Sequence, residues 1–264
     1  MALSAHSESQ SSAALLATGE PSPVWTRRLD GASPFVLVAD HAGCAVPQRL
    51  GALGLPEAEL RRHIGWDLGS AKVALRLSAM LKAALLMQRY SRLVIDCNRP
   101  LHSAESIVTV SDGTVIPGNA SVTSADAGQR AREIFLPYHA AIAALLDERR
   151  QQRRATALIA IHSFTPVWNG RRRPWQVGVL YNRDPRLAQA LGRALAAEGR
   201  LNVGYNEPYD LSDQTDWTIP EHGERRGLPH VELEIRQDLI ADSAGQQQWA
   251  TRLARLLPPL LAAL

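Results

Sequence analysis

The stretch Pro34-Phe-Val-Leu-Val-Ala39, followed by Asp40-His41-Ala-Gly43, has the pattern of a buried parallel strand that ends in polar residues. A short run of apolar and β-branched residues is typical of a strand that is covered on both faces of a sheet. Ala157-Leu-Ile-Ala-Ile161 repeats this pattern and is followed by His162. We therefore expect His41 and His162 each to lie just after a strand.

A third apolar run, Ser91-Arg-Leu-Val-Ile-Asp96, is predicted to form another buried strand, and Asn98 and Arg99 follow it. Ligands of open α/β sheets bind outside the carboxyl ends of the strands. The polar residues after the three runs are therefore expected to converge at one edge of the sheet.

Helical segments and further apolar runs alternate along the rest of the chain. Helices are predicted from about residue 56 and over about 68–87, 125–150, 184–198 and 245–263, and strands near 176–181, 201–205 and 229–235. This alternation predicts the α/β class, with a single domain whose mixed, mostly parallel sheet is flanked by helices on both faces. Residues 1–22, rich in Ser and Ala, are expected to form a disordered or loosely attached tail, and residues 23–264 the domain.

The composition restricts the partners and the location that we expect. The chain has 264 residues, 45% of them hydrophobic, which suffices for the core of one large domain. Two cysteines are too few for a disulfide framework, and no run of apolar residues is long enough to span a membrane, so we expect a cytoplasmic protein without membrane contact. The net charge of +3 comes from scattered basic residues, so nucleic-acid binding is not expected. The oligomeric state is left open.

Two histidines after strands, with carboxylates nearby, favour a metal site. Catalytic zinc sites commonly use three nitrogen or carboxylate ligands and leave one position for water. We expect zinc, or another divalent metal, to be held by His41, His162 and Asp67, which precedes a predicted helix and has a helix cap as its alternative role. The alternatives for the third ligand are Asp40, Asp96, His63 and Cys44.

Five blocks of sequence occur in order between residues 41 and 236. They are His41-Ala-Gly43 with Pro47, Trp66-Asp67-Leu-Gly69, Ser91-Arg-Leu-Val-Ile-Asp-Cys-Asn-Arg-Pro100, His162-Ser163-Phe-Thr-Pro166 and Glu232-Leu-Glu234-Ile-Arg236. Together they resemble the N-formylglutamate amidohydrolase family. The resemblance implies the fold of zinc carboxypeptidases and aspartoacylases, and hydrolysis of an amide on an amino acid. Broader relatives commonly begin their metal site with His-x-x-Glu, where this chain has Cys44 in place of the glutamate.

The resemblance also implies roles for residues around the expected metal. Arg99, with Asn98, is expected to bind a substrate carboxylate, because a guanidinium stays charged and can donate two parallel hydrogen bonds. Arg92 is a candidate to polarise the scissile carbonyl, with a solvent-facing position at the start of a strand as the alternative. Glu207 and Tyr209, in a long loop, are expected near the substrate.

Glu234 is the candidate for proton transfer. Strand alternation places Glu232, Glu234 and Arg236 on one face of a strand, although an exposed face with paired charges is the alternative interpretation. A glutamate near zinc can take a proton from water and deliver it to the leaving nitrogen. The resemblance favours Glu234 over Glu232 for this role.

These residues predict a zinc-dependent hydrolase that acts on a small molecule with a carboxylate. The resemblance implies release of formate from N-formyl-L-glutamate in histidine breakdown, although the motifs also allow a larger acyl group. Two other functions stay open. One is another N-acylamino-acid deacylase or a carboxypeptidase of the same fold, and the other is a non-catalytic binding protein on this fold.

Overall fold

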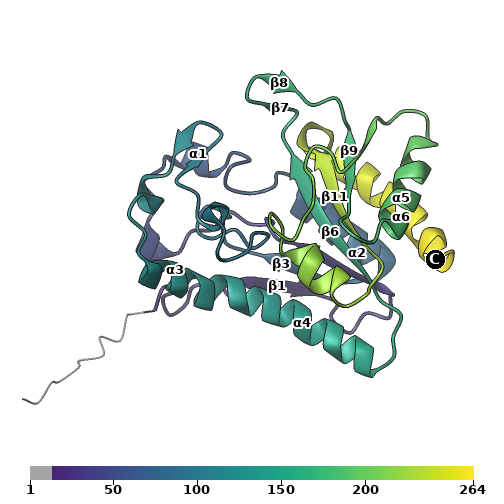
Figure 1. Cartoon of the computed structure of the whole chain (residues 1–264), viewed down its shortest axis with the longest axis horizontal. Helices are drawn as coiled ribbons and strands as arrows, with labels where there is room; N and C mark the ends of the chain where they lie inside the picture. Colours follow the sequence, from purple (N-terminus) through teal and green to yellow (C-terminus); the bar gives the residue numbers. More distant parts are fainter. Residues whose placement is uncertain (1–13) are drawn as a thin grey trace, which may run out of the picture.

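Seven strands within residues 14–264, the part of the chain that the computed structural model describes, form one mixed sheet (Figure 1). Their spatial order is β1 (Val24–Arg27), β3 (Ala84–Gln88), β2 (Phe35–Ala39), β6 (Ala157–Phe164), β11 (His230–Arg236), β9 (Val177–Leu180) and β10 (Val203–Tyr205). The central strands β3, β2, β6 and β11 are parallel, whereas β1 is antiparallel to β3 and β9 is antiparallel to β11. The predicted mixed, mostly parallel sheet is therefore confirmed.

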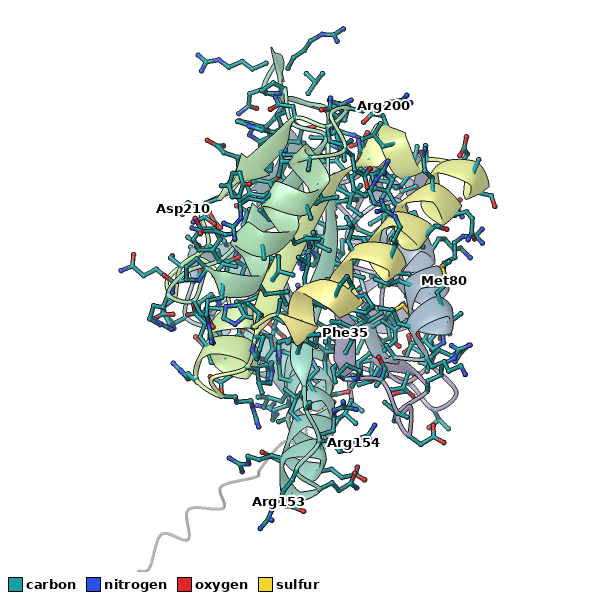
Figure 2. The ribbon with its side chains drawn as sticks, turned by 90° about the vertical axis from the view of Figure 1, so that its right-hand side faces the viewer. Phe35, Met80, Arg153, Arg154, Arg200 and Asp210 are labelled. Carbon is teal, nitrogen blue, oxygen red and sulfur yellow. The ribbon has the colours of Figure 1, made fainter. Side chains whose placement is uncertain are left out.

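Helices cover both faces of this sheet and close an apolar core against each. One face carries α2 (Ser70–Leu81), α5 (Arg186–Ala196) and α6 (Ser243–Ala262), and the other carries α4 (Leu136–Gln151). Alternate strand residues serve the two cores, since Leu37 and Ile159 pack with the first set of helices and Val36 and Leu158 with α4. Figure 2, viewed from the side of the first set, shows α5 and α6 lying in front of the sheet. The predicted single α/β domain with helices on both faces is confirmed.

The remaining elements are short and lie between the main strands and helices. They are α1 (Glu57–Leu60), α3 (Ser124–Arg130), the π-helical turns η4 (Ala131–Phe135) and η5 (Ile219–Glu224), the 3-10 turns η1 (Gln48–Leu50), η2 (Ala104–Ser106), η3 (Pro117–Asn119) and η6 (Gln237–Ile240), and the hairpins of β4 (Val110–Ser111) with β5 (Thr114–Val115) and of β7 (Val167–Trp168) with β8 (Arg171–Arg172). None of the described helices is long and apolar enough to cross a membrane.

Most of the predicted elements beyond residue 120 are present with slightly different ends. The helix predicted over 125–150 is the continuous helical run of α3, η4 and α4. The predicted later helices and strands correspond to α5, α6, β9, β10 and β11. The helix expected from residue 56 is only the four-residue α1.

The helix predicted over residues 68–87 ends at Leu81, and strand β3 follows it. Lys82 takes a left-handed backbone conformation with φ 51°, and the Ser78 hydroxyl donates to the Ala83 carbonyl at 2.7 Å, which closes the helix end. The residues of β3 are Ala, Leu, Met and Gln, which favour helices in isolation. Pairing with β1 on one side and β2 on the other overrides that preference.

The strand predicted over residues 91–96 is wrong, because this segment is an irregular loop. The Ser91 hydroxyl donates to the Gly65 carbonyl at 2.7 Å and accepts from the backbone N–H of Leu93 at 3.2 Å, which turns the chain. Leu93, Val94 and Ile95 are buried in the same core as α4. The apolar run therefore reflects a buried loop rather than a strand.

The predicted tail over residues 1–22 lies partly outside the described residues, which begin at residue 14. Residues 14–22 form no helix or strand. Leu15 is nevertheless buried, and the backbone N–H groups of Leu15 and Leu16 donate to the Glu133 carboxylate at 2.8 and 2.9 Å. This part of the segment packs on the domain.

Candidate metal centre and substrate cavity

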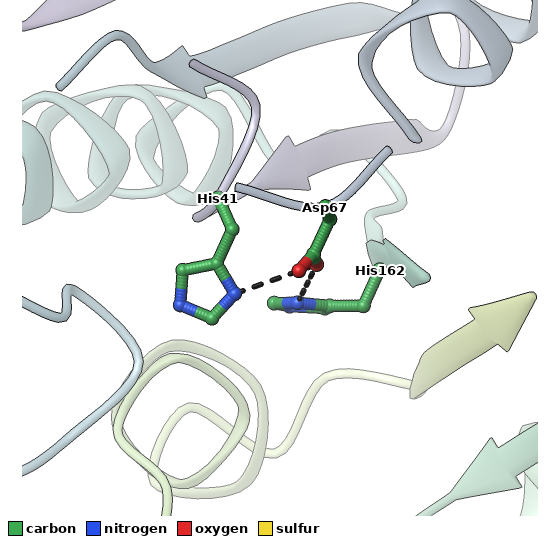
Figure 3. A group of neighbouring side chains, drawn as sticks. All are labelled: His41, Asp67 and His162. Carbon is green, nitrogen blue, oxygen red and sulfur yellow. Dashed lines mark hydrogen bonds and ion pairs between the residues drawn. The ribbon is translucent and has the colours of Figure 1, made fainter. Parts of the chain in front are cut away.

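His41, Asp67 and His162 come together at the carboxyl end of two neighbouring parallel strands (Figure 3). His41 is the second residue after β2, and His162 lies near the end of β6 rather than after it as predicted. Asp67 precedes α2, and its backbone N–H donates to the His41 carbonyl at 2.9 Å. One ligand atom of each residue lies within 4.8 Å of the others, and all three residues are buried. The structure thus assembles the three predicted metal ligands in one place.

Each histidine of this group turns Nδ1 toward Asp67 and Nε2 toward a second carboxylate. The Nδ1 atoms of His162 and His41 lie 2.9 and 3.4 Å from Oδ2 of Asp67. Nε2 of His41 lies 2.7 Å from Oδ1 of Asp96, and Nε2 of His162 lies 3.1 Å from Oδ2 of Asp40. In metal-binding histidines, the ring nitrogen that does not bind the metal usually donates a hydrogen bond to such a carboxylate, which fixes the orientation of the ring. Asp40 and Asp96 therefore lie on the side of each ring that faces away from Asp67.

The buried Nδ1 of His41 has no hydrogen-bond partner among the described residues. An unpaired buried ring nitrogen is unfavourable, so its position calls for an interaction partner. Nitrogen and carboxylate donors are the ligands that zinc prefers, and Nδ1 of His162 and Asp67 stand beside this atom. The three residues therefore fit a divalent metal ion.

The two supporting carboxylates are ionised. Burial raises the pKa of both, but it is outweighed at Asp96 by Arg92, His41 and Arg99 together and at Asp40 by His162, His41 and His139 together, so each pKa lies below its ordinary value. Arg92 donates to Oδ2 of Asp96 from Nε at 3.1 Å and from Nη2 at 2.6 Å. The Tyr138 hydroxyl donates to Oδ1 of Asp40 at 2.8 Å. Ionised acceptors favour the histidine form that carries its proton on Nε2, which leaves Nδ1 for a metal.

Glu232 and Glu234 lie on β11, the strand next to β6. Glu234 pairs in register with His162, and both glutamates are buried and line one cavity. Burial raises the pKa of each to about 8, against the attraction of His162. Oε2 of Glu234 has no hydrogen-bond partner in the described chain, whereas Oε2 of Glu232 accepts from Nδ2 of Asn98 at 3.3 Å. Of the two glutamates, Glu234 is thus the one with a buried oxygen that no described residue binds.

A cavity of about 660 Å³ contains the metal-ligand group and two guanidinium groups, those of Arg92 and Arg99. Nη1 of Arg92 lies 3.5 Å from Oδ1 of Asp67, which places its charge beside the metal ligands. Arg99 pairs with Glu105 at 3.0 Å and with Asp216 at 3.4 Å. Both side chains can donate hydrogen bonds to carbonyl or carboxylate oxygens of a bound molecule.

The sequence model of the N-formylglutamate amidohydrolase family matches residues 33–241. The chain belongs to this family. The solved structure of gene product Atu2144 from Agrobacterium tumefaciens is 36% identical, with a TM-score of 0.91 over 94% of this chain and 98% of that one. N-formylglutamate amidohydrolase from Ralstonia eutropha JMP134 is 19% identical and has the same fold, with a TM-score of 0.68 over 92% of this chain and 98% of that one. No curated protein matches the chain.

In this member of the N-formylglutamate amidohydrolase family, two of the alternatives for the third ligand, His63 and Cys44, lie away from the metal-ligand group. His63 lines the cavity, but its Nε2 lies 3.3 Å from Oδ2 of Asp112, and burial lowers its pKa. Cys44 lines a different cavity. Among the described residues, Asp67 is the carboxylate that has an oxygen within 4.8 Å of a ring nitrogen of both His41 and His162.

Asn98, expected to contact substrate, uses its amide within the protein. Nδ2 donates to Asp216 and Glu232, each at 3.3 Å. Oδ1 accepts from the backbone N–H groups of Trp217 and Thr218 at 3.2 and 3.0 Å. Asn98 lines the cavity, but its contacts are those of a residue that holds the 216–218 loop against β11.

Of the two loop residues expected near the substrate, Tyr209 lines the cavity and Glu207 does not. The Tyr209 hydroxyl accepts from Nη1 of Arg173 at 3.0 Å, and the Arg173 guanidinium lies 4.9 Å from the centre of its ring. The Glu207 carbonyl packs against Gly178 of β9 so closely that a Cβ there would come within 2.0 Å of it. Glu207 is therefore held by its backbone beside the sheet.

Three residues that support the site could not be singled out from the sequence: Asp216, Arg173 and Tyr138. Arg173 belongs to a run with Arg171 and Arg172, which are exposed, so composition does not distinguish it. Asp216 and Tyr138 act through contacts with Arg99 and Asp40, which are 117 and 98 residues away in the sequence.

Proposed function

We propose that this chain is a zinc-dependent amidohydrolase that removes a formyl or other acyl group from an acidic amino acid, with N-formyl-L-glutamate as the first substrate to test. The observation that carries the proposal is the convergence of two histidine Nδ1 atoms on the Asp67 carboxylate, beside the unpaired oxygen of Glu234. Membership of the N-formylglutamate amidohydrolase family supports hydrolysis of an amide.

His41, His162 and Asp67 would hold the metal ion. A bound zinc ion would supply Lewis acidity, which lowers the pKa of water and polarises a carbonyl oxygen. Asp96 and Asp40 already orient both imidazoles, so the rings need no rearrangement. The donor set favours zinc, with manganese and iron as the alternatives to be compared.

Glu234 would move the protons of the reaction. Burial raises the pKa of its carboxyl to about 8, and the positive charge of a bound metal ion would favour the ionised form. Oε2 can then accept a proton from the attacking water and later donate it to the leaving nitrogen. Register pairing with His162 holds Glu234 beside the metal ligands throughout.

The two arginines of the cavity would bind the oxygens of the substrate. Arg92, beside Asp67, is placed to stabilise the negative charge that develops on the scissile carbonyl oxygen. Arg99 would bind the substrate carboxylate, in competition with its present partners Glu105 and Asp216. Asn98 would act by keeping Asp216 in place. A cytoplasmic location and a role in histidine breakdown stay predictions.

The proposal is tested by metal analysis and by formate release from N-formyl-L-glutamate, on protein purified without chelator. We expect about one metal ion per chain, hydrolysis that stops on chelation, and loss of both metal and activity in His162→Ala. His102→Ala, which removes an exposed histidine, is the matched control and should keep both. Activity that survives in His162→Ala, or metal-loaded protein that hydrolyses no N-acyl amino acid, would contradict the proposal.

A further inference from the structure

The cavity extends beyond the residues that the proposed reaction uses. The metal ligands, Arg92 and Arg99 account for one part of its lining. Five further lining residues, here called the outer end, are His63, Val110, Asp112, Trp168 and Tyr209. These residues come from segments that the reaction leaves without a role.

Two short hairpins supply most of the outer end. Val110 and Asp112 belong to the hairpin of β4 and β5, and Trp168 belongs to the hairpin of β7 and β8. The β7–β8 hairpin projects beyond the main sheet (Figure 1). Loops that a rigid scaffold carries next to a reaction centre are common sites of substrate selection.

The aromatic side chains of the outer end are held in fixed positions. The rings of His63 and Trp168 meet edge to face, with centroids 6.0 Å apart and an interplanar angle of 74°. The Arg173 guanidinium lies 5.4 Å from the Trp168 ring and 4.9 Å from the Tyr209 ring, so one cation ties the two side chains together. Arg173 itself is not among the residues that line the cavity. The result is a preformed aromatic wall.

The carboxylate of the outer end, that of Asp112, already has a positively charged partner outside the cavity lining. Asp112 lies 2.6 Å from Nη2 of Arg62 and 3.3 Å from Nε2 of His63. Val110 is an apolar side chain that is 53% exposed although it lines the cavity. An uncharged, apolar group would therefore find more favourable contacts here than a carboxylate.

The cavity is larger than a formyl group requires. A formyl carbon presents only a hydrogen atom on the side away from the amide, so it leaves the outer end without contacts. A volume of about 660 Å³ falls in the range of sites that enclose ligands much larger than a small acyl amino acid, about 300–1,000 Å³.

We propose that the outer end binds the acyl group of the substrate, and that this group is larger than formyl and carries an aromatic or similarly planar ring. The inference rests on the proposed function and names the substrate class within it. Arg99 would fix the carboxylate at the other part of the cavity, where its backbone N–H donates to the carbonyl of Asp96, the partner of Arg92. On its other side, the backbone N–H of Arg92 donates to the carbonyl of Gly65, two residues from His63. With its scissile carbonyl at Arg92, a substrate held in this way would extend its acyl group toward Trp168 and Val110.

The test compares kcat/KM for N-formyl-, N-acetyl- and N-benzoyl-L-glutamate on zinc-loaded protein. We expect kcat/KM to rise from formyl to benzoyl. Trp168→Ala and Val110→Ala should lower the ratio of benzoyl to formyl turnover by about tenfold or more, because each removes apolar contact with the ring. Val115→Ala is the matched control, since Val115 pairs with Val110 in the same hairpin, is 61% exposed and does not line the cavity. It should leave the ratio as it is.

The outcomes separate this inference from the function on which it rests. Formyl turnover that exceeds benzoyl turnover, or a Trp168→Ala effect equal for all three acyl groups, overturns the acyl assignment and leaves the hydrolase intact. The assignment is also overturned if Trp168→Ala changes kcat/KM by different factors for N-formyl-L-leucine and N-formyl-L-glutamate, which differ only in the amino-acid side chain. Absence of turnover with every substrate overturns the proposed function, and the inference with it.

Discussion

Nε2 of His41 lies 2.7 Å from Oδ1 of Asp96, so that only Nδ1 of this ring is free to bind a metal. Replacing Asp96 with Asn removes the ionised acceptor and should weaken zinc binding by about tenfold to a hundredfold. Competition with a chromogenic chelator measures the change in Kd. Asp213→Asn removes an exposed carboxylate that pairs with Arg183, and should leave the Kd unchanged. Equal zinc affinity in Asp96→Asn and wild type would show that Asp96 does not support a ligand.

Glu234→Gln should keep the metal and lose the reaction, because glutamine cannot accept a proton. We expect kcat to fall by about a hundredfold to ten-thousandfold with unchanged metal content. Glu57→Gln, which alters an exposed glutamate paired with Arg61, is the control for loss of a carboxylate elsewhere. The measurements are formate release and metal analysis on the same samples. Full activity in Glu234→Gln would transfer the proton-transfer role to Glu232.

Arg99→Met should raise KM for N-formyl-L-glutamate by about tenfold or more, because a charge-assisted hydrogen bond to the substrate carboxylate is lost. The same variant should have little effect on the substrate analogue whose α-carboxylate is a carboxamide. Steady-state kinetics with both compounds measures the difference, and Arg61→Met, at an exposed arginine, is the control. An equal effect on the acid and the amide would mean that Arg99 acts on the fold of the cavity and not on the carboxylate.

A buried histidine pair should weaken folding as the pH is lowered from 7.5 to 5, whereas Glu232 and Glu234, with pKa values of about 8, act in the opposite direction. His139 and His222 stack 5.2 Å apart, with Nδ1 and Nε2 at 3.0 Å. Burial lowers the pKa of His139 to about 4, and burial together with the charge of His139 lowers that of His222 to about 3. Below the unfolded pKa of about 6.5, the unfolded chain binds more protons than the folded chain, so folding weakens by up to about 1.4 kcal/mol per pH unit and group.

Urea unfolding at pH 7.5 and pH 5 measures this effect in wild type and in His222→Gln. Glutamine keeps a hydrogen-bonding amide beside His139 but does not titrate in this range. Between pH 7.5 and pH 5 the free energy of unfolding should therefore change in favour of the folded state in the variant relative to wild type, because the other groups titrate equally in both proteins. The same pH dependence in both would show that the pair does not contribute.

The sequence predicted the metal-ligand group because two simple rules apply to it. The apolar runs that end at His41 and His162 are strands β2 and β6, and these pair in parallel, so their carboxyl ends meet at one edge. Asp67 could be placed there because it precedes a helix, α2, which packs on the same sheet. The positions of all three ligands could thus be predicted from local sequence patterns.

Other parts of the site depend on contacts that no local pattern contains. Strand β3 could not be predicted because its residues favour helices. The loop at 91–96 has the sequence pattern of a strand because its apolar residues, Leu93 and Val94 among them, are buried. The roles of Asp40 and Asp96 depend on which ring nitrogen each carboxylate meets, and loop packing decides that. The occupied amide of Asn98 depends likewise on a loop more than a hundred residues away.

Anomalous diffraction at the zinc edge from zinc-loaded crystals tests the central claim most directly. We expect one strong peak beside Nδ1 of His41, Nδ1 of His162 and the Asp67 carboxylate, with Asp96 and Asp40 still on the Nε2 atoms. A peak at another place, such as between His63 and Asp112, or no peak in protein that hydrolyses N-acyl amino acids, would contradict it.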